Sequence, residues 1–409
     1  MFDTFTINRF QQLETPFYYY NLNILKQTLT ACRKASSKYR FHVHYAMKAN
    51  FNPKVLDIIQ LGGFGADCVS GNEVKAAITH GFDKGKVVFA GVGKSDKEIN
   101  EALDADIFCF NAESVQELVV INDLAKIKNR IANIAIRINP NVDAHTHHFI
   151  TTGLDENKFG INIWQLPDVA NTLRSCSNLK FLGIHFHIGS QITDMEVYKN
   201  LCTRINEMQD WFEDHGFILK ILNAGGGLGV DYHNPDTHTI CDFESYFKVF
   251  NDFLKVRPNQ EVHFELGRAL VAQSASLISR VLYVKNGLKK NFLILDAGMT
   301  ELIRPMLYQA YHLIENLSRR EPDVMEHKES ESLNLEKTVY SLNSHLPTSI
   351  YKYNVVGPIC ESTDCFQKDV ELPQSYRGDL IAIRTAGAYG EVMASGYNLR
   401  DRVGSIYSE

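Results

Sequence analysis

Short apolar runs alternate along the first two thirds of the chain with segments whose apolar residues recur every three or four positions. That recurrence is typical of amphipathic helices, and the short runs have the length of strands. Eight strands with intervening helices over roughly 230 residues match the count and size of a (β/α)8 TIM barrel. A doubly wound sheet could carry the same strands. The predicted strands are residues 43–49, 65–70, 87–91, 107–110, 134–139, 182–190, 221–227 and 262–267.

The helical segments carry recognisable start signals. Pro53 and Pro167 stand where first-turn prolines belong. Asn72, Ser95 and Asn111 are plausible N-caps, since their side chains can accept from the first free backbone N–H groups.

After about residue 270 the pattern changes to strands with few helices between them, over a stretch long enough for a second, all-β domain. The N-terminal PFYYYN segment is also strand-like and is expected to pair with that domain. We therefore predict a barrel over 26–271 and a β domain formed by 1–25 with 272–409. An acidic stretch at about 319–337 is expected to be a solvated surface segment.

Composition narrows the class of protein without naming a function. The 409 residues are 44% hydrophobic and carry a net charge of −6 without a basic block, so we expect no binding to nucleic acid or anionic membrane. No apolar run approaches the ~18 residues of a membrane helix. Eight scattered cysteines without a C-x-x-C pair favour free thiols in a reducing, cytoplasmic compartment.

Catalytic groups of a barrel lie at the carboxyl ends of its strands. Lys48 ends the first predicted strand; it could be a surface charge, or a desolvated amine of depressed pKa that forms a Schiff base with a carbonyl. His185 and His187 share a predicted strand face. They could be a hydrogen-bonded core pair or a metal-ligand pair, or place an imidazole flat on a cofactor ring.

The next two strand ends add a glycine-rich turn and a buried acid. AGGGLG at 224–229 could bring backbone N–H groups to a phosphate, although such turns are common. Glu265 is costly on a core strand unless it is paired, and a protonated ring nitrogen would pair it. Pyridoxal phosphate combines the four chemical groups that these positions could bind: an aldehyde, a flat ring, a ring nitrogen and a phosphate. We predict this cofactor and no metal, because no third histidine and carboxylate stand at comparable strand ends.

The motifs YAMKAN, HFHIGSQ, GGGLG, ELGR, DAGMTELIRPMLY, GPICES and GAYG together resemble the fold-type III pyridoxal-phosphate decarboxylases, in the family's order over about residues 15–400. RINPNVDAHTHHFITTGLDENKFG and HIGSQITD resemble the diaminopimelate branch more than the ornithine and arginine branches. The resemblance implies decarboxylation of meso-diaminopimelate to L-lysine, the last step of lysine biosynthesis. Another basic amino-acid decarboxylase, acting on ornithine, arginine or lysine, is the alternative.

The resemblance also implies a homodimer whose active sites lie between the barrel of one subunit and the β domain of the other. Lys48 would carry the cofactor, His187 would stack on its ring, and Cys360 would act as a general acid in the neighbouring site. The cofactor residues would be Lys48, His187, Ser190, Gly226, Gly227, Glu265, Gly267, Arg268 and Tyr389. The substrate residues would be Arg268, Arg304, Tyr308, Glu361 and Tyr389, with Glu361 taking the distal ammonium.

Some of these residues have structural explanations as well. Arg304 could be a surface loop charge, Cys360 a buried small side chain, and Tyr308 and Tyr389 packing aromatics. A racemase on the same cofactor, or a cofactor carrier on the same barrel, would share part of the pattern. The chain departs from the family pattern at Leu266, where proline is expected, and at Thr300, where asparagine is expected.

Overall fold

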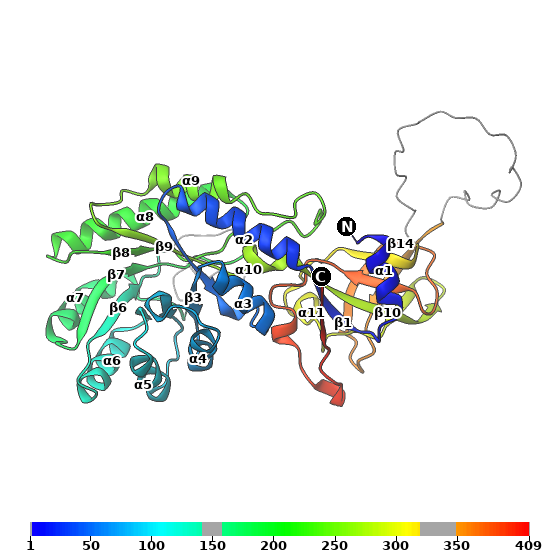
Figure 1. The fold of residues 1–409 in the computed structure, drawn as a ribbon, viewed down its shortest axis with the longest axis horizontal. Helices are drawn as coiled ribbons and strands as arrows, with labels where there is room; N and C mark the ends of the chain where they lie inside the picture. The colour runs from blue at the N-terminus through cyan, green and yellow to red at the C-terminus, as the bar shows by residue number, and fades with distance from the viewer. Residues whose placement is uncertain (1, 141–157, 320–348, 409) are drawn as a thin grey trace, which may run out of the picture. The chain divides into compact units, whose positions relative to one another are not determined.

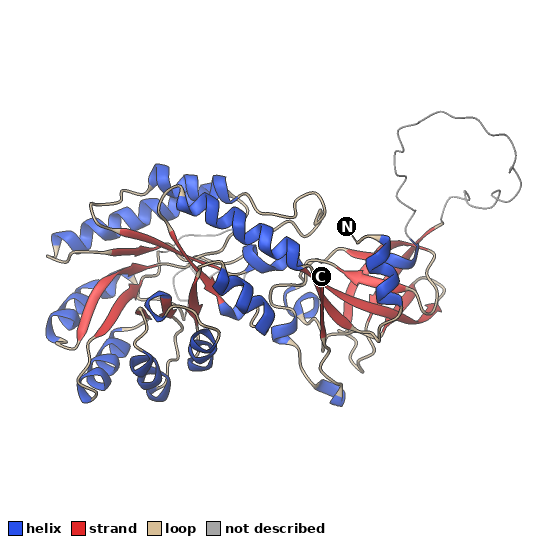
Figure 2. Ribbon diagram, in the orientation of Figure 1, coloured by secondary structure: helices blue, strands red, loops and turns tan. Residues whose placement is uncertain are grey.

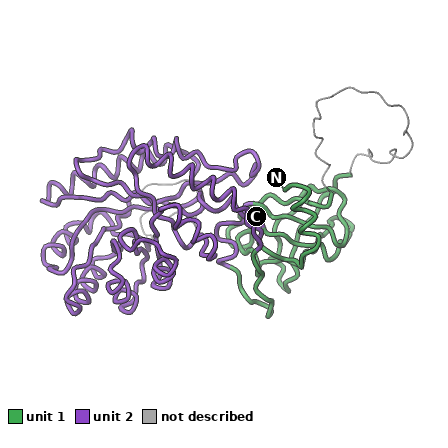
Figure 3. The backbone as a smooth tube through the Cα atoms, viewed as in Figure 1, with its two compact units in different colours: residues 1–18, 277–384, 394–405 green, residues 19–276, 385–393, 406–409 purple. Residues whose placement is uncertain are grey.

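The computed structural model describes residues 2–140, 158–319 and 349–408, and in these ranges the chain forms two compact units (Figure 3). The barrel unit comprises 19–276, 385–393 and 406–409, and the β unit 1–18, 277–384 and 394–405. Residues 385–393 thus belong with the barrel, whereas the sequence pattern groups them with the β domain. Most of the acidic stretch and most of the segment 137–160, which begins RINPNV, lie outside the described residues.

Eight parallel strands close into a barrel in the order of the chain (Figure 1). The first strand pairs with the last, so that no strand edge is left open. The (β/α)8 prediction is therefore confirmed and a doubly wound sheet is excluded. The strands are β2 His42–Ala46, β3 Gly65–Cys68, β4 Val87–Phe89, β5 Cys109–Ala112, β6 Ala132–Arg137, β7 Leu179–His185, β8 Ile221–Asn223 and β9 Glu261–Leu266.

Helices connect these strands, and several begin as the sequence predicts. Pro53 and Pro167 lie in the first turns of α3 and α7, and Ser95 forms a capping box with Glu98 at the start of α5. The helices of this unit are α2 Leu22–Ser37, α3 Pro53–Leu61, α4 Gly71–Thr79, α5 Asp96–Ala105, α6 Val115–Ile127, α7 Leu166–Ser175, α8 Met195–Asp214, α9 Phe243–Phe253 and α10 Arg268–Val271.

Two predicted caps are wrong. Ser70, rather than Asn72, caps α4, and Ser114, rather than Asn111, caps α6. Asn111 lies inside β5 and is buried, so its amide serves the barrel interior.

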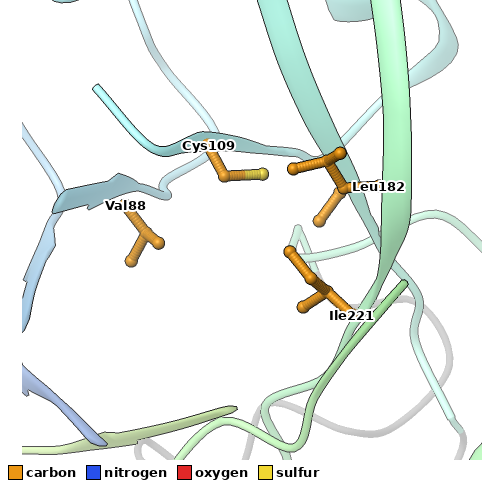
Figure 4. Packing of buried hydrophobic residues seen from close by; sticks show 5 residues of the cluster. Val88, Cys109, Leu182 and Ile221 are labelled. Carbon is orange, nitrogen blue, oxygen red and sulfur yellow. The ribbon is translucent and has the colours of Figure 1, made fainter. Parts of the chain in front are cut away.

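One layer of the barrel interior is apolar. Val88, Cys109, Ala135, Leu182 and Ile221 come from the consecutive strands β4 to β8 and form one buried cluster, which Figure 4 shows from close by. Fully burying an aliphatic side chain of this size is worth roughly 1.5–3 kcal/mol. This layer stabilises the barrel, and the polar groups are displaced toward the strand ends.

The β unit is built on an open sheet in the order β12-β15-β10-β11-β13-β14, with β1 paired to β10 as expected for the PFYYYN segment. Figure 2 shows its strands in red. The strand pairs along this path are antiparallel except β11 with β13. The unit is mostly β and not all β as predicted, since it also contains two helices, α1 Thr4–Gln11 and the short α11 Arg304–Tyr308. The strands wholly within this unit are β11 Asn291–Leu295, β12 Ile314–Asn316, β13 Ile350–Val356, β14 Cys365–Pro373 and β15 Leu380–Ile383. Three further strands of the sheet belong to it only in part: β1 Phe17–Tyr20, β10 Ala275–Asn286 and β16 Ser405–Tyr407, which pairs with β1.

None of the helices in the described ranges combines the length and the apolar character that a membrane crossing requires.

Candidate active site

The carboxylate of Glu265 lies buried at the end of β9 and accepts hydrogen bonds from three other strands. Asn111 and Asn223 donate their amide N–H groups to Oε1 at 3.0 and 2.7 Å, and the Nε2–H of His185 donates to Oε2 at 2.8 Å. Burial alone would raise the pKa of this carboxyl, but His185, and then the charge of Lys48, hold the pKa of Glu265 well below its ordinary value. Glu265 is therefore an ionised carboxylate inside the barrel.

Glu265 retains room for one more donor. A carboxylate offers about four lone-pair sites, and the three hydrogen bonds use three of them. The remaining site suits an N–H group of a ligand in the adjoining cavity. A protonated pyridine nitrogen is such a donor, so the residues present fit the ring of the predicted cofactor.

Lys48 lies in the short turn Met47–Ala49 directly after β2, two residues beyond the end of a strand that is shorter than predicted. Its Nζ is 3.5 Å from Oδ2 of Asp67, and 36% of its side chain is exposed. Burial would lower the pKa of this amine, but the charge of Asp67 outweighs it and raises the pKa of Lys48 above its ordinary value. Of the two alternatives for Lys48, the amine of depressed pKa is therefore not the one found: Lys48 is a cation in this structure.

Asp67, at the end of β3, is a site residue that sequence reasoning missed. It is 1% exposed, and no hydrogen bond of ordinary geometry reaches either carboxylate oxygen from the described residues. Burial, and then the charge of Glu265, raise the pKa of Asp67, and the Lys48 cation opposes them. The GADC run gives no sign of this role, because an acid in a short buried strand acquires its partner only when β2 and β3 pair.

His187 follows β7 and lines the cavity, whereas His185 ends that strand and contacts Glu265. Only His185 therefore lies in the strand, and His187 lies two residues beyond its end. The backbone N–H of Gly226 donates to Nδ1 of His187 at 3.3 Å, so the ring proton is on Nε2. Burial, followed by the charge of Lys48, lowers the pKa of His187 well below its ordinary value, and the ring is neutral. Within the described ranges, His185 and His187 belong to no cluster suited to a metal ion.

In the glycine turn, the backbone of Gly226 and Gly227 packs directly against the backbone of neighbouring segments. A Cβ on Gly226 would lie 1.9 Å from the carbonyl oxygen of Glu265. Gly227 has φ +105°, and a Cβ there would lie 2.8 Å from the carbonyl oxygen of Gly189. Only glycine fits these positions, and the bare backbone borders the cavity where an anion can approach it.

These elements enclose one cavity at the carboxyl end of the barrel. Eight of the nine predicted cofactor residues line it, and the ninth, Gly226, lies directly behind Glu265. The lining is Ala46, Lys48, His187, Ser190, Gly227, Leu228, Glu265, Leu266, Gly267, Arg268 and Tyr389.

Arg268 is held by three neighbours at this cavity. Its guanidinium donates to the hydroxyl of Ser190 at 3.0 Å and to that of Tyr232 at 2.5 Å, and it lies 5.0 Å from the ring centroid of Tyr389. Tyr389 adopts φ +57°, which is uncommon for a tyrosine, and its backbone N–H donates to the carbonyl of Ala49 at 2.8 Å. Tyr232 is a further contact that the sequence did not indicate.

The other predicted substrate residues belong to the β unit. Arg304 is buried and donates to Nε2 of His312 at 2.9 Å, while Nδ1–H of His312 donates to the carbonyl of Arg384 at 2.8 Å. A surface loop charge is thereby excluded for Arg304. Tyr308 is half-buried at the end of α11.

Cys360 and Glu361 lie on an exposed loop of the same unit. Asp364 holds this loop against the DAGMT turn, accepting from the backbone N–H of Met299 at 2.7 Å. Glu361 accepts from the hydroxyl of Tyr397 at 2.6 Å. Of the eight cysteines, Cys360 is the exposed one and the other seven are buried or half-buried, so a packing role for Cys360 is excluded.

The two departures from the family pattern are accommodated locally. Leu266 is buried and lines the cavity between Glu265 and Arg268, which keep their places. Thr300 donates its hydroxyl to the buried carboxylate of Glu301 at 2.9 Å.

Comparisons with known proteins agree with this geometry. The family model described as the pyridoxal-binding domain of pyridoxal-dependent decarboxylases matches residues 23–272. A diaminopimelate decarboxylase of Bacteroides thetaiotaomicron is 54% identical over 398 residues, which cover 97% of this chain and 96% of that protein. The crystal structure of Helicobacter pylori diaminopimelate decarboxylase complexed with L-lysine aligns with TM-score 0.86 and 36% identity over 98% of this chain and 94% of its own. A second diaminopimelate decarboxylase complexed with L-lysine, from M. jannaschii, aligns with TM-score 0.84 and 29% identity over 98% and 89%.

Replacing Asp67 with asparagine is expected to lower the pKa of the Lys48 amine, because it removes the negative charge that opposes the effect of burial. A neutral amine attacks an aldehyde faster, so cofactor-free protein should take up pyridoxal phosphate with a pH midpoint at least about one unit lower than the wild type. The rate of cofactor uptake at each pH is measured from the absorbance of the bound cofactor, and the midpoint is read from the dependence of this rate on pH. Glu101→Gln, which removes a surface carboxylate 2.9 Å from Lys75, should leave the midpoint in place. Equal midpoints for Asp67→Asn and wild type would contradict this role.

Proposed function

The chain belongs to the pyridoxal-dependent decarboxylase family, and we propose that it converts meso-diaminopimelate to L-lysine and carbon dioxide, the last step of lysine biosynthesis. One observation carries the proposal. Lys48, His187 and Glu265 line a single cavity, in a chain 54% identical over nearly its whole length to a diaminopimelate decarboxylase.

Pyridoxal phosphate is the cofactor that these residues would hold. The amine of Lys48 reaches the cavity, and Glu265 has one accepting site left. Ser190 and Arg268, with the glycine turn, offer donors for a phosphate at the same cavity. Once bound, the cofactor takes up the electron pair released when the substrate's carboxylate leaves.

The protein's own groups set the charge pattern that this chemistry needs. Lys48 would anchor the cofactor's aldehyde between turnovers. Glu265, ionised inside the barrel, would hold a proton on the ring nitrogen through its free lone pair. His187 would cover one ring face as a neutral imidazole, so that no second cation competes with that proton.

The substrate supplies two charges at its distal end, an ammonium and a carboxylate. Glu361 would take the ammonium and Arg304 the carboxylate, since a guanidinium suits bidentate carboxylate binding. Tyr308 and Tyr389 would line the substrate, and Arg268 would contribute a second guanidinium. The His312 contact fixes one edge of the Arg304 guanidinium, which orients it for such a ligand.

Cys360 would deliver the proton that replaces the lost carboxylate at the α-carbon. We propose that it does so in the neighbouring subunit of a homodimer. Its exposure on the surface of the β unit supports that assignment, because an exposed thiol can enter a site formed by another chain.

Protein loaded with pyridoxal phosphate should convert meso-diaminopimelate to lysine, measured by chromatography together with released carbon dioxide. Ornithine, arginine and lysine lack the distal carboxylate, so their kcat/KM should be at least ~100-fold lower. Absence of lysine at high enzyme concentration would overturn the proposed function, and comparable turnover of ornithine would assign the chain to another decarboxylase branch.

Cys360→Ala should lower kcat by about 10²–10⁴-fold with little change in KM, because a positioned general acid contributes that much. Cys365→Ala removes a half-buried thiol nearby in the sequence and should leave kcat unchanged. Steady-state kinetics distinguish the two variants. Equal kcat for Cys360→Ala and wild type would remove the proton-donor role.

Subunit mixing tests whether the site is shared. Lys48→Ala and Cys360→Ala homodimers should each be nearly inactive. Exchange between them should restore about a quarter of wild-type activity, because half of the dimers then hold one intact site of two. Mixing Lys48→Ala with Lys48→Arg is the matched control and should restore none. A mixture of Lys48→Ala and Cys360→Ala as inactive as this control would contradict shared sites.

A further inference from the structure

The amino end of the barrel carries a group of side chains that decarboxylation does not use. His42 is the first residue of β2 and Glu261 the first of β9, with His263 two positions further along β9. His42 and His263 face each other in the register of the β2–β9 pair, the seam that closes the barrel. All three border a cavity of about 240 Å³, and the cofactor residues lie at the opposite ends of the same strands.

The three side chains have the spacing of metal ligands. Among the described residues they are the one group of three whose ligand atoms all lie within 4.8 Å of one another. Nε2 of His263 is 3.2 Å from Oε2 of Glu261, and Nε2 of His42 is 4.0 Å from the same oxygen. A tetrahedral ion at ~2.1 Å sets its ligand atoms roughly 3.4 Å apart. The side chains of His42 and Glu261 are 48% and 56% exposed, so they can make that adjustment.

A hydrogen-bond relay fixes which nitrogen of His263 faces Glu261 and whether it bears a proton. Nδ1 of the buried His44 lies 2.9 Å from the carbonyl of Lys86, which only accepts, so this nitrogen bears the proton. In the neutral ring the other nitrogen, Nε2, then has a lone pair and accepts. Nδ1 of His263, 2.8 Å away, is therefore the donor.

Nε2 of His263 then has a lone pair directed at the Glu261 carboxylate, and these two groups repel each other unless a cation lies between them. A second proton on the ring would be one such cation and a metal ion another. The relay through His44 holds the imidazole in the tautomer and orientation that a metal ligand needs, as outer hydrogen bonds do in metal sites.

The three side chains also have the chemistry of metal ligands, although the cations Arg33 and Lys86 border the same cavity. Two imidazoles and one carboxylate, with room for water, make a donor set typical of zinc.

We propose that His42, Glu261 and His263 bind a divalent transition-metal ion of the zinc class, which clamps the first strand of the barrel to the last at the end opposite the cofactor cavity. His44 is a positioning residue for this site. Because the ion binds the folded barrel and joins residues more than 200 positions apart in the chain, it stabilises the fold and leaves decarboxylation unchanged.

Titration of chelator-treated holoenzyme with zinc chloride, followed by calorimetry, tests the site. One ion per chain should bind, and Tm should rise by about 5 °C at a roughly 100-fold excess over Kd. His42→Ala and Glu261→Gln alter exposed side chains, so each should fold, retain activity, and weaken zinc binding at least ~10-fold. His80→Ala, which removes an imidazole 2.6 Å from Asp57 outside the cluster, should bind zinc as the wild type does.

Two results would overturn the proposal. The first is the absence of stoichiometric zinc binding by the wild type, which would leave His263 and Glu261 as a proton-bridged pair. The second is equal zinc affinity in the wild type, His42→Ala and Glu261→Gln, which would assign the binding to scattered surface histidines.

Discussion

One buried charge, the carboxylate of Glu265, constrains the carboxyl end of the barrel. Removing a carboxylate from water costs several kcal/mol even after the protein relaxes, so the group must be surrounded by donors. The donors come from β5, β7 and β8, so they meet only in the closed barrel. The neighbouring layer of Val88, Leu182 and Ile221 stays apolar and supplies stability, which leaves the polar end free to be built for a ligand.

Burial and this charge together act on the protonation of the neighbouring groups. It contributes to the raised pKa of Asp67, and Asp67 in turn keeps the Lys48 amine protonated. With that cation close by, a buried His187 is neutral. The cavity thus holds a fixed anion and a neutral ring, with an amine whose charge depends on its partner. That pattern suits a cofactor whose ring nitrogen must stay protonated while its aldehyde reacts with an amine.

Much of this could be predicted from the chain alone, because the βα rhythm and the residues after each strand are local signals. Lys48, His187 and Glu265 stand next to strand ends that the hydrophobic pattern locates within a few residues. The partners of Glu265 could not be found in this way. Asn111 has the position of a helix cap, and Asn223 ends a short apolar run, so neither carries a local mark of its role.

Long-range placement accounts for the remaining differences. The segment around Tyr389 follows the strands of the β unit in the chain, yet its backbone bonds to Ala49 in the barrel unit to which it belongs. His44 and His263 are separated by 219 positions, and only closure of the barrel brings their rings together. Neither arrangement has a periodicity or motif that a linear pattern could reveal.

The ionised state of Glu265 is the centre of this account, and the protonation of the cofactor's ring nitrogen reports on it most directly. In protein loaded with ¹⁵N-labelled pyridoxal phosphate, the nitrogen chemical shift should be that of a protonated pyridine at neutral and mildly alkaline pH. Glu265→Gln should move it to the value of the neutral ring. A neutral-ring shift in the wild-type protein would contradict the account.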